Sequence, residues 1–490
     1  MHIFRKKRSE EKAYPYIKAP LVAQSSKIQS SMFKVQSAKI LTVLRSYGLT
    51  LFFLFCFLPL FAQNDTISVK TEITKIKDDV EKNLIEIKKL KKLKISGYIQ
   101  GQFEVGQEFA STKVGNPTSY NKERDGKSGD FFRFGLRRGR IKIAWEETWG
   151  TAVFQLDLTE KGITFKDVYF KVSEPWLKVA SLTVGIFDRP FGDEISYSSS
   201  RRESPERTVL FQKLFPDERD LGAMVTLAAP KSTKLEGLKL DAGAFCGNGI
   251  TLPDNGKMDF IGHLKYDKKW KKLTFGIGAS MYYGTVRNRD TMLYTIKKED
   301  GVSKWVEKEV EPFKKNVRQY YGFDAQFSAQ TSWGITNIRG EILWGTQPST
   351  SKDFGSPKWN LWQTGTSSLQ YAADYNHIRK FWGAHTYFVQ DIYKTPLTVV
   401  LKYAYLNPNT QISKEAITNK IDLPYHYLGA GLLVKCTSYL RLMCFYELPF
   451  NSTKNAIPVP ENPSSGKIHI ANYQKHVEEG VFTCRLQFKF

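Results

Sequence analysis

The sequence predicts an all-β fold, namely a sixteen-stranded antiparallel transmembrane β-barrel that follows a short periplasmic coiled-coil helix. Three observations predict it. Apolar and polar residues alternate with a period of two from about residue 95 to the end of the chain. Short and long connections alternate along the chain between these segments. Aromatic residues make up 14% of the chain although its mean hydropathy is negative, which is typical of a wall between lipid and water.

Residues 1–63 are predicted to be a signal peptide with an N-terminal extension. The uncharged run from Leu49 to Phe61 is too short for a spanning helix, which needs about 20 residues, but it suits the apolar region of a signal peptide. The basic segment before it is longer than export requires. We therefore hypothesise that translation begins at Met32, which a precursor containing residues 1–31 would contradict. A signal anchor is the alternative, and Pro59 disfavours it.

Residues 64–94 are predicted to form a periplasmic coiled-coil helix. Apolar residues recur there at spacings of three and four, among them Ile73, Ile76, Val80 and Ile87, and charged residues flank them. β-Branched residues at both seam positions favour three or more helices. The alternative is an isolated helix that lies on the rest of the protein.

Residues 95–490 are predicted to form the transmembrane barrel. In the last segment, 480–490, Phe482 and Phe488 fall on one side of an extended chain and Arg485 and Lys489 on the other. The predicted strands lie near residues 95–105, 131–146, 151–159, 164–173, 179–187, 220–229, 236–246, 258–267, 271–283, 317–330, 333–346, 379–391, 396–406, 425–435, 438–448 and 480–490. The alternation slips by one residue near Arg138, and a β-bulge at Gly139 would absorb the slip.

The connections sort by length. Short turns alternate with long loops such as 106–130, 188–219, 284–316, 347–378 and 449–479. Membrane barrels have short periplasmic turns and long external loops, whereas a soluble β-sandwich gives no reason for such sorting. Closure also removes unpaired strand edges, which lipid does not tolerate, and sixteen strands leave an aqueous channel. Both ends of the barrel chain are therefore expected on the short-turn side.

The formal charge of +23 points to anionic partners. The first 63 residues hold 10 Lys and Arg and 2 Asp and Glu, so the remainder keeps 62 basic and 47 acidic residues, a net charge of +15. Such an excess suits nucleic acid, acidic headgroups or small anions in a charged pore. No DNA- or RNA-binding motif accompanies it, so nucleic acid is not expected as a partner.

The long connection 188–220 is the candidate pore constriction. It combines many charges with the apolar residues Phe191, Phe211, Leu214 and Phe215, which a solvated external loop would not need. A loop folded inward would bury them and hold its charges across the lumen, where charged rings set ion selectivity. The alternative is a solvated flap that is paired internally. The candidate residues are Arg189, Arg201, Arg202, Glu203, Glu206, Arg207, Lys213 and Arg219.

A basic ladder is expected on the pore wall. Strand parity points Arg133, Arg137, Arg140 and Lys142 toward the lumen, since arginine on the lipid face costs about 2–4 kcal/mol near the midplane. The alternative role of these bases is to pair with lumenal acids such as Asp157. Further bases are expected from other strands, and the candidates are Lys171, Arg339, Lys402, Arg441, Arg485 and Lys489.

Enzymatic functions have little support. The six histidines after residue 63 form no metal-ligand motif, and no G-x-S-x-G or phosphate-cradling loop occurs. We expect no cofactor and no metal site. The five cysteines, Cys56, Cys246, Cys436, Cys444 and Cys484, have no C-x-x-C spacing and are interpreted as small apolar residues. An outer-membrane hydrolase remains an alternative, because the Ser and His of such a site come together only in the folded chain and need not form a sequence motif.

The runs RRGRIKIAWEETWGTAVFQLDLTEKGITFKDVYFKV, LTVGIFDRPFGDEISYSSSRRESPER and FPDERDLGAMV resemble the phosphate-selective porin O and P family of outer-membrane proteins, most clearly over residues 131–230. The resemblance implies a sixteen-stranded trimeric porin whose third loop folds into the pore, and passage of phosphate and related anions along an arginine and lysine ladder. The terminal Phe490 resembles the signal for the barrel-assembly machinery. One feature departs from the family, because residues 188–220 hold six bases and eight acids.

The predicted function is passive diffusion of small hydrophilic solutes, with small anions expected, across the outer membrane of a Gram-negative envelope. The expected partners are outer-membrane lipid, two further copies of the chain and the barrel-assembly machinery. A second hypothesis is structural, in which the coiled coil tethers the barrel to the periplasm or cell wall. Deletion of residues 65–94 separates the two, because unchanged flux with loss of envelope attachment favours the tether.

Overall fold

The computed structural model describes residues 65–490 apart from 108–109, 111–112, 115–130, 251–255, 289–290, 313, 352, 357–375, 413–416, 418–419 and 452–478. The chain divides into two compact units, and the second runs from Lys89 to Phe490. The predicted signal peptide and the hypothetical start at Met32 lie outside the described residues.

A single long helix, α2 (Asp65–Leu90), precedes the barrel. Its apolar side chains are about half exposed, for example Ile76 at 62% and Val80 at 51%. No helix in the described part of the chain is long and apolar enough to cross a membrane. The predicted helix at 64–94 therefore corresponds to α2. Its association into a coiled coil stays a prediction. The first strand begins at Leu93, two residues earlier than the sequence indicated.

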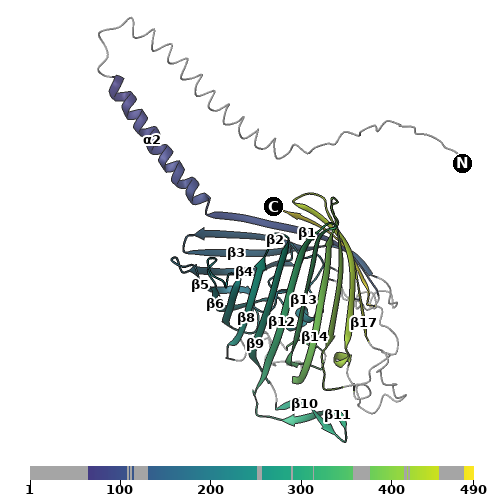
Figure 1. Ribbon diagram of the computed structural model, residues 1–490. Helices are drawn as coiled ribbons and strands as arrows, with labels where there is room; N and C mark the ends of the chain where they lie inside the picture. Colours follow the sequence, from purple (N-terminus) through teal and green to yellow (C-terminus); the bar gives the residue numbers. More distant parts are fainter. Residues whose placement is uncertain are drawn as a thin grey trace, which may run out of the picture. The chain divides into compact units, whose positions relative to one another are not determined.

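Sixteen antiparallel strands close into a barrel, as predicted (Figure 1). The last strand pairs with the first, with Tyr98 opposite Lys489 and Gly106 opposite Val481. Closure leaves the barrel no free edge. The barrel strands are β1 (Leu93–Gly106), β2 (Phe131–Glu147), β3 (Gly150–Thr159), β4 (Gly162–Ser173), β5 (Ala180–Asp188), β6 (Arg219–Ala228), β7 (Leu238–Phe245), β8 (Asp259–Lys269), β9 (Leu273–Arg287), β12 (Lys315–Thr331), β13 (Gly334–Ser349), β14 (Asn376–Asp391), β15 (Leu397–Asn407), β16 (Tyr425–Lys435), β17 (Leu440–Asn451) and β18 (Val481–Lys489).

Two further strands, β10 (Met292–Glu299) and β11 (Val302–Glu309), form a hairpin within a long loop. They lie outside the barrel wall, because β9 pairs directly with β12 from Arg287 to Leu273. The hairpin also pairs in parallel with the start of β14 at Leu293 and Tyr294. The sequence predicts only a long loop at 284–316, so the hairpin is an addition to the prediction.

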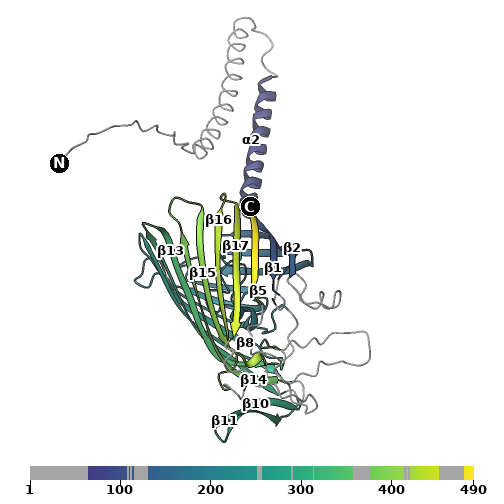
Figure 2. The same cartoon turned by 90° about the vertical axis from the view of Figure 1, so that its right-hand side faces the viewer.

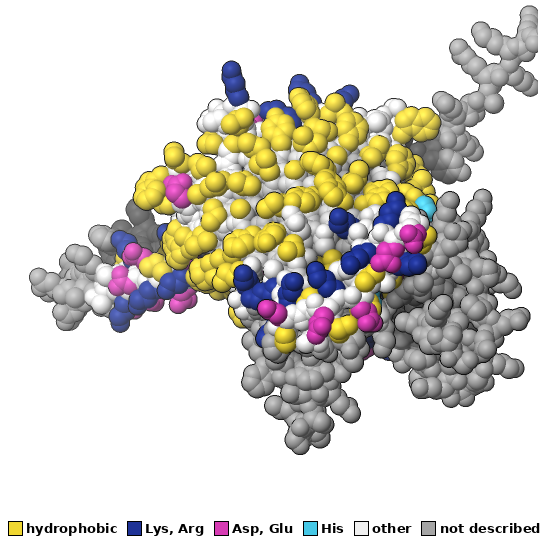
Figure 3. Space-filling view, turned by 90° about the horizontal axis from the view of Figure 1, so that it is seen from below, with side chains coloured by type: hydrophobic (Ala, Val, Ile, Leu, Met, Phe, Trp, Pro, Cys, Tyr) yellow, Lys and Arg dark blue, Asp and Glu magenta, His cyan; other side chains and the backbone are white. Residues whose placement is uncertain are grey.

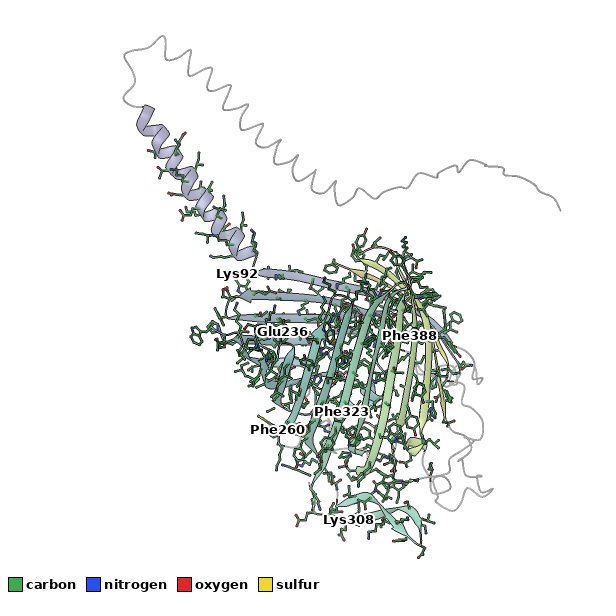
Figure 4. All side chains as sticks on the ribbon, in the orientation of Figure 1. Lys92, Glu236, Phe260, Lys308, Phe323 and Phe388 are labelled. Carbon is green, nitrogen blue, oxygen red and sulfur yellow. The ribbon has the colours of Figure 1, made fainter. Side chains whose placement is uncertain are left out.

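The strands present apolar side chains outward and polar side chains inward. On β18, Phe482, Leu486 and Phe488 are exposed, whereas Arg485 is 1% exposed. Phe260 on β8, Phe323 on β12 and Phe388 on β14 lie on different strands of the wall (Figure 4), and all three are exposed. Hydrophobic side chains cover much of the wall in Figure 3, and charged side chains gather in other areas of that view. The exterior is therefore apolar although the interior is charged.

Connections at the two ends of the barrel differ as predicted. One end carries seven short turns and both ends of the barrel chain, since the Gly97 amide donates to the carbonyl of Phe490 at 3.0 Å. Figure 2 shows β18 ending at the end of the barrel where β1 begins. The other end carries eight loops, L1 to L8, at residues 107–130, 160–161, 189–218, 246–258, 288–314, 350–375, 408–424 and 452–480. L2 is the one short member.

The predicted bulge is displaced. Between β1 and β2, Gln100 pairs with Arg138 and Gly101 pairs with Leu136, so Arg137 is the additional residue. Gly139 instead lies in regular register opposite Ile99. The prediction of a bulge at Gly139 is therefore wrong by two residues. A bulge at Arg137 lets consecutive arginines, Arg137 and Arg138, both reach the interior.

Candidate functional site

Loop L3 lies inside the barrel, held to one wall by apolar side chains. Phe191, Phe211 and Phe215 are at most 1% exposed. They belong to an apolar cluster together with inward-facing wall residues such as Tyr282 on β9 and Tyr320 on β12. The ring centroids of Phe191 and Phe215 are 5.0 Å apart, and Phe215 meets Tyr320 edge-on at 5.7 Å. Burial of three phenylalanines, each stabilising by about 1.5–3 kcal/mol, keeps the loop against this wall.

Polar contacts anchor the same part of L3. The amides of Asp193 and Glu194 donate to one carboxylate oxygen of Glu341, at 3.1 and 2.6 Å. The hydroxyl of Tyr387 donates to Glu194 at 2.9 Å, and that of Thr208 does so at 2.6 Å. The short helix α4 (Val209–Leu214) follows at once and contributes Leu210, Phe211 and Leu214 to the buried face. The two bonds to Glu341 satisfy backbone amides that would otherwise be unpaired away from the strands.

The other side of L3 reaches the opposite wall through Glu206. Its carboxylate accepts hydrogen bonds from Arg137 at 2.7 Å, from Arg138 at 2.7 Å and from Arg485 at 3.0 Å. Arg137 and Arg138 come from β2 and Arg485 comes from β18. We call these four residues the Glu206 cluster. It carries three positive charges and one negative charge, because arginine remains protonated in proteins.

Glu203 forms the second bridge between L3 and the wall. It accepts hydrogen bonds from Arg339 on β13 at 2.6 Å and from the hydroxyl of Tyr197 at 2.7 Å. The Arg339 guanidinium also lies 4.4 Å from the ring centre of Tyr197 and 4.3 Å from that of Tyr387. Cation–π contacts at this distance hold a guanidinium in place, so two aromatic rings and one carboxylate fix Arg339.

The remaining L3 candidates are placed at the base of the loop and on its surface. Arg189 pairs with Asp220 at 3.0 Å, and Arg219 pairs with Asp167 at 2.9 Å. Arg207 donates to the carbonyl of Glu194 at 2.8 Å and forms an ion pair with Glu218. Lys213 is half-buried and pairs with Asp353 of L6 at 2.7 Å, and Arg201 is exposed beside the ring of Tyr197.

Arg202 differs from its neighbours. It is 2% exposed, and its Nη2 donates to the carbonyl of Tyr197 at 3.1 Å. Within the described residues, its Nε and Nη1 have no hydrogen-bond partner. A guanidinium offers five donors, so Arg202 is a buried cation whose donors are only partly used.

The predicted wall ladder is brought together only in part. Arg137 joins the Glu206 cluster, and Arg140 pairs with Asp157 at 3.1 Å and donates to the hydroxyl of Ser199 at 3.0 Å. Arg133 lies nearer the loop end and pairs with Glu160 at 3.5 Å. Lys142 faces the interior, opposite Ser96, and no ion pair of it occurs in the described part of the chain. These bases line one strand, but they do not share one contact.

L3 separates two chambers. The loop-side chamber, about 770 Å³, is lined by Glu206, Lys213, residues of L6 and residues at the loop ends of β16 and β17. The turn-side chamber, about 760 Å³, is lined by Arg201, Glu203, Arg339 and the turn ends of several strands. The chambers share no lining residue. Ser204, which is fully buried between Glu203 and Glu206, donates to the carbonyl of Glu206 at 2.8 Å and lies at the division.

The chambers carry opposite charge. The ionisable residues that line the loop-side chamber are Glu104, Lys113, Glu206, Lys213, Asp353, Glu447 and Glu479, a net charge of −3. Those that line the turn-side chamber are Asp193, Arg201, Glu203, Lys265, Asp267, Arg339, Asp391, Lys435, Arg441 and Lys489, a net charge of +2. A charged solute therefore meets a change of sign on crossing L3.

Neighbouring groups keep two carboxylates of L3, those of Glu206 and Glu194, ionised. Burial alone would raise the pKa of Glu206, but Arg137, Arg138 and Arg485 outweigh burial and hold this pKa well below its usual value. Burial opposes ionisation of Glu194 too, yet His385, Lys402 and Thr208 lower the pKa of Glu194 to about 2. Both groups are therefore charged throughout the ordinary pH range.

The sequence does not predict the Glu206 cluster as a unit. Arg138 is absent from the predicted candidates, and Arg485 is among the further bases expected from other strands. The doublet of arginines at the phase slip was the available signal for Arg138. No group of three or more His, Cys, Asp or Glu in the described residues is arranged to hold a metal ion.

No family model matches the sequence, and no curated protein does. Three solved structures similar to the chain are the outer membrane channel DcaP of Acinetobacter baumannii, OmpF of Salmonella typhi in complex with daunomycin, and the outer membrane protein OmpT of Vibrio cholerae in a trimer form. DcaP is 10% identical, with 81% of this chain and 97% of that chain covered and a TM-score of 0.47. OmpF is 10% identical, with 81% of this chain and 97% of that chain covered and a TM-score of 0.46. OmpT is 9% identical, with 81% of this chain and 99% of that chain covered and a TM-score of 0.44. The chain itself is a closed sixteen-stranded antiparallel barrel with a loop folded into its interior.

Proposed function

We propose that this protein is an outer-membrane porin through which small hydrophilic solutes, and anions such as phosphate above all, diffuse passively. The observation that carries the channel is the pair of chambers inside a closed barrel, separated by L3, and the arginines around Glu206 carry the preference for anions. A barrel with apolar outer side chains and a charged interior suits a bilayer that surrounds an aqueous path.

The charge at the division supports anions. L3 taken alone, with its flanking residues, has two more acids than bases. Its acids are paired with bases of the wall, however: Glu206 with three arginines and Glu203 with Arg339. The Glu206 cluster is net positive, and Arg202 adds a buried charge with free donors. Charged groups at a constriction decide which ions pass.

Phosphate is the proposed solute because arginine presents forked donors that match its oxygens. The resemblance of residues 131–230 to the phosphate-selective porin O and P family points the same way. The roles of Arg133, Arg137, Arg140 and Lys142 as a ladder, and of L3 as the constriction, are part of this proposal.

We propose a homotrimer. Strands β3, β5, β6 and β7 are only 8 to 10 residues long, whereas β12, β13 and β14 have 16 or 17. At about 3.3 Å per residue and a tilt near 45°, the short strands rise ~19–23 Å, less than the ~25 Å apolar band. Neighbouring copies that cover this wall would remove the mismatch with lipid.

A periplasmic coiled coil made by α2 fits the same assembly. Its exposed stripe, with Ile73, Ile76, Val80 and Ile87 each 47–62% exposed, is what association of three helices would bury. This stripe also favours the second candidate function, in which α2 tethers the barrel to a periplasmic partner or the cell wall. Export through a signal peptide and insertion by the barrel-assembly machinery, with Phe490 at the end of β18, belong to the proposal.

Proteoliposomes test the function. The purified full chain is reconstituted, and efflux of radiolabelled phosphate is compared with that of a neutral sugar and of a lysine-sized cation. We expect efflux of all small solutes, fastest for phosphate. Arg202→Gln is expected to slow phosphate more than sugar, whereas Lys271→Gln in the exposed β8–β9 turn removes the same charge outside the chambers and serves as control. Liposomes that retain every solute would contradict the channel, and equal effects of both variants would contradict the site.

A further inference from the structure

Two cysteines lie directly opposite each other on the last two strands. Cys444 on β17 and Cys484 on β18 are register partners, and their Sγ atoms are 3.4 Å apart. Residues directly opposite in an antiparallel pair have Cα atoms about 4.5 or 5.5 Å apart, and a disulfide accepts about 4.4–6.8 Å. The backbone is therefore already suited to a bond, which needs only small side-chain rotations.

Both thiols face outward. Cys484 alternates with the inward residues Thr483 and Arg485 and shares its face with Phe482 and Leu486, which are exposed. On β17, Cys444 has the same orientation as the exposed Tyr446. In the proposed membrane this face is covered by lipid, so a water-soluble oxidant or reductant cannot reach the pair after insertion.

We propose that Cys444 and Cys484 form a structural disulfide, made in the periplasm before the strands enter the membrane. The inference rests on the proposed export. The oxidant is a periplasmic thiol–disulfide oxidoreductase. One cysteine thiolate attacks its disulfide, and the other then attacks the mixed disulfide. A Cys444–Cys484 bond forms, the oxidoreductase is reduced to a dithiol by two electrons, and the two thiol protons are released or taken up by that dithiol.

The bond acts on the strand that closes the barrel. β18 pairs with β17 on one side and with β1 on the other, and L8 separates it from β17 in sequence. A slip of one residue would turn Arg485 toward lipid and Phe482 toward the lumen. A bond between Cys444 and Cys484 permits only the observed register, and it restricts the unfolded chain around L8.

Two other cysteines provide internal controls. Cys246 follows β7 and Cys436 follows β16, and in this structure all four described cysteines, Cys444 and Cys484 included, are free thiols. Neither Cys246 nor Cys436 is a register partner of a cysteine in the described strands. An oxidising compartment alone does not pair them, so they report whether oxidation is specific to the opposed pair.

The test is thiol mapping of the full chain from isolated outer membranes of a Gram-negative host. Membranes are dissolved in denaturant with a maleimide and no reductant, and peptides are identified by mass. We expect one linked peptide that contains Cys444 and Cys484, and maleimide on Cys246 and Cys436. In a host without its periplasmic dithiol oxidase, all four are expected to carry maleimide. Maleimide on Cys444 and Cys484 in the ordinary host would overturn the proposal, even where phosphate efflux is normal. Absence of the protein from outer membranes would instead contradict the proposed function.

A pair of variants tests the role of the bond. Cys444→Ser is expected to lower the temperature at which the extracted barrel loses its folded mobility in detergent gels, and Cys246→Ser is expected to leave it unchanged. The same shift is expected when the natural chain is denatured and refolded with reductant. Equal melting of natural, Cys444→Ser and reduced protein would overturn the stabilising role. If Cys444→Ser fails to fold, the reduced natural chain still gives the comparison.

Discussion

Arg485 in the last strand donates a 3.0 Å hydrogen bond to Glu206 in L3, although 279 residues separate the two in sequence. Arg485 is 1% exposed, so this is an interior ion pair. Since β18 is the strand that closes the barrel, Glu206 obtains its full set of partners only when closure is complete. The position of the internal loop is thereby linked to the integrity of the wall.

Neutralising Glu206 is expected to strengthen preference for anions. Glu206→Gln leaves Arg137, Arg138 and Arg485 without a counter-charge, and breaking a buried pair by removing one partner costs about 3–5 kcal/mol. The reversal potential in a salt gradient should move toward that of the anion, and current noise should increase as the loop loosens. Glu299→Gln on the exposed hairpin strand β10 is the matched control. Identical reversal potentials for both variants would contradict the assignment.

The docking of L3 is expected to resist mild acid. The folded pKa of Glu206 is lowered by its arginines, so its stabilising contribution is fully present above the ordinary value of about 4.3. The contribution is lost as the pH falls through the lower folded pKa. Channel conductance should therefore stay constant from pH 7 to about pH 5 and change only below about pH 4. In Glu206→Gln this acid transition should vanish, and a transition near pH 6 in the natural protein would argue against the pair.

Removing an apolar anchor should release the loop without opening the barrel wall. Phe211 is 1% exposed, and truncation of a buried phenylalanine costs about 3–5 kcal/mol. Phe211→Ala is expected to make L3 cleavable by protease in detergent and to raise conductance. Phe323→Ala removes the same atoms from a side chain that is 59% exposed on the outer wall. Equal protease sensitivity of the two variants would show that L3 does not depend on its apolar face.

A charge in the α2 stripe should weaken the oligomer. Val80→Lys places an ammonium group where the proposed coiled coil is apolar, whereas the neighbouring Glu81→Lys introduces a lysine beside the proposed seam. Mass photometry of detergent extracts should find fewer trimers for Val80→Lys at low protein concentration. If neither variant changes the oligomer but Val80→Lys alone weakens envelope attachment, α2 serves the tether instead.

The sequence predicted the wall because a period of two is local information. Each strand could be located from its own residues. The alternation of short turns with long loops predicted that the barrel is closed and that both ends of its chain lie on the short-turn side. The inward course of L3 followed from one anomaly, the burial-prone residues Phe191, Phe211, Leu214 and Phe215 in a charged connection.

What escaped prediction depends on register and on distant partners. The β10–β11 hairpin has an Asp300-Gly301 turn with positive φ at both residues, 51° and 82°, a recognised hairpin signal, but its strands alternate weakly. The bulge at Arg137 depends on the pairing of β1 with β2, which no single segment encodes. The opposition of Cys444 and Cys484 likewise required the exact alignment of β17 with β18.

Single-channel recording in a planar bilayer tests the central claim most directly. The purified full chain is added to one side under a tenfold gradient of potassium chloride, and then of potassium phosphate. Discrete conductance steps are expected, with a reversal potential displaced toward the equilibrium potential of the anion. Folded protein that inserts yet gives no steps would contradict the channel, and a reversal potential displaced toward potassium would contradict the role given to the arginines around Glu206.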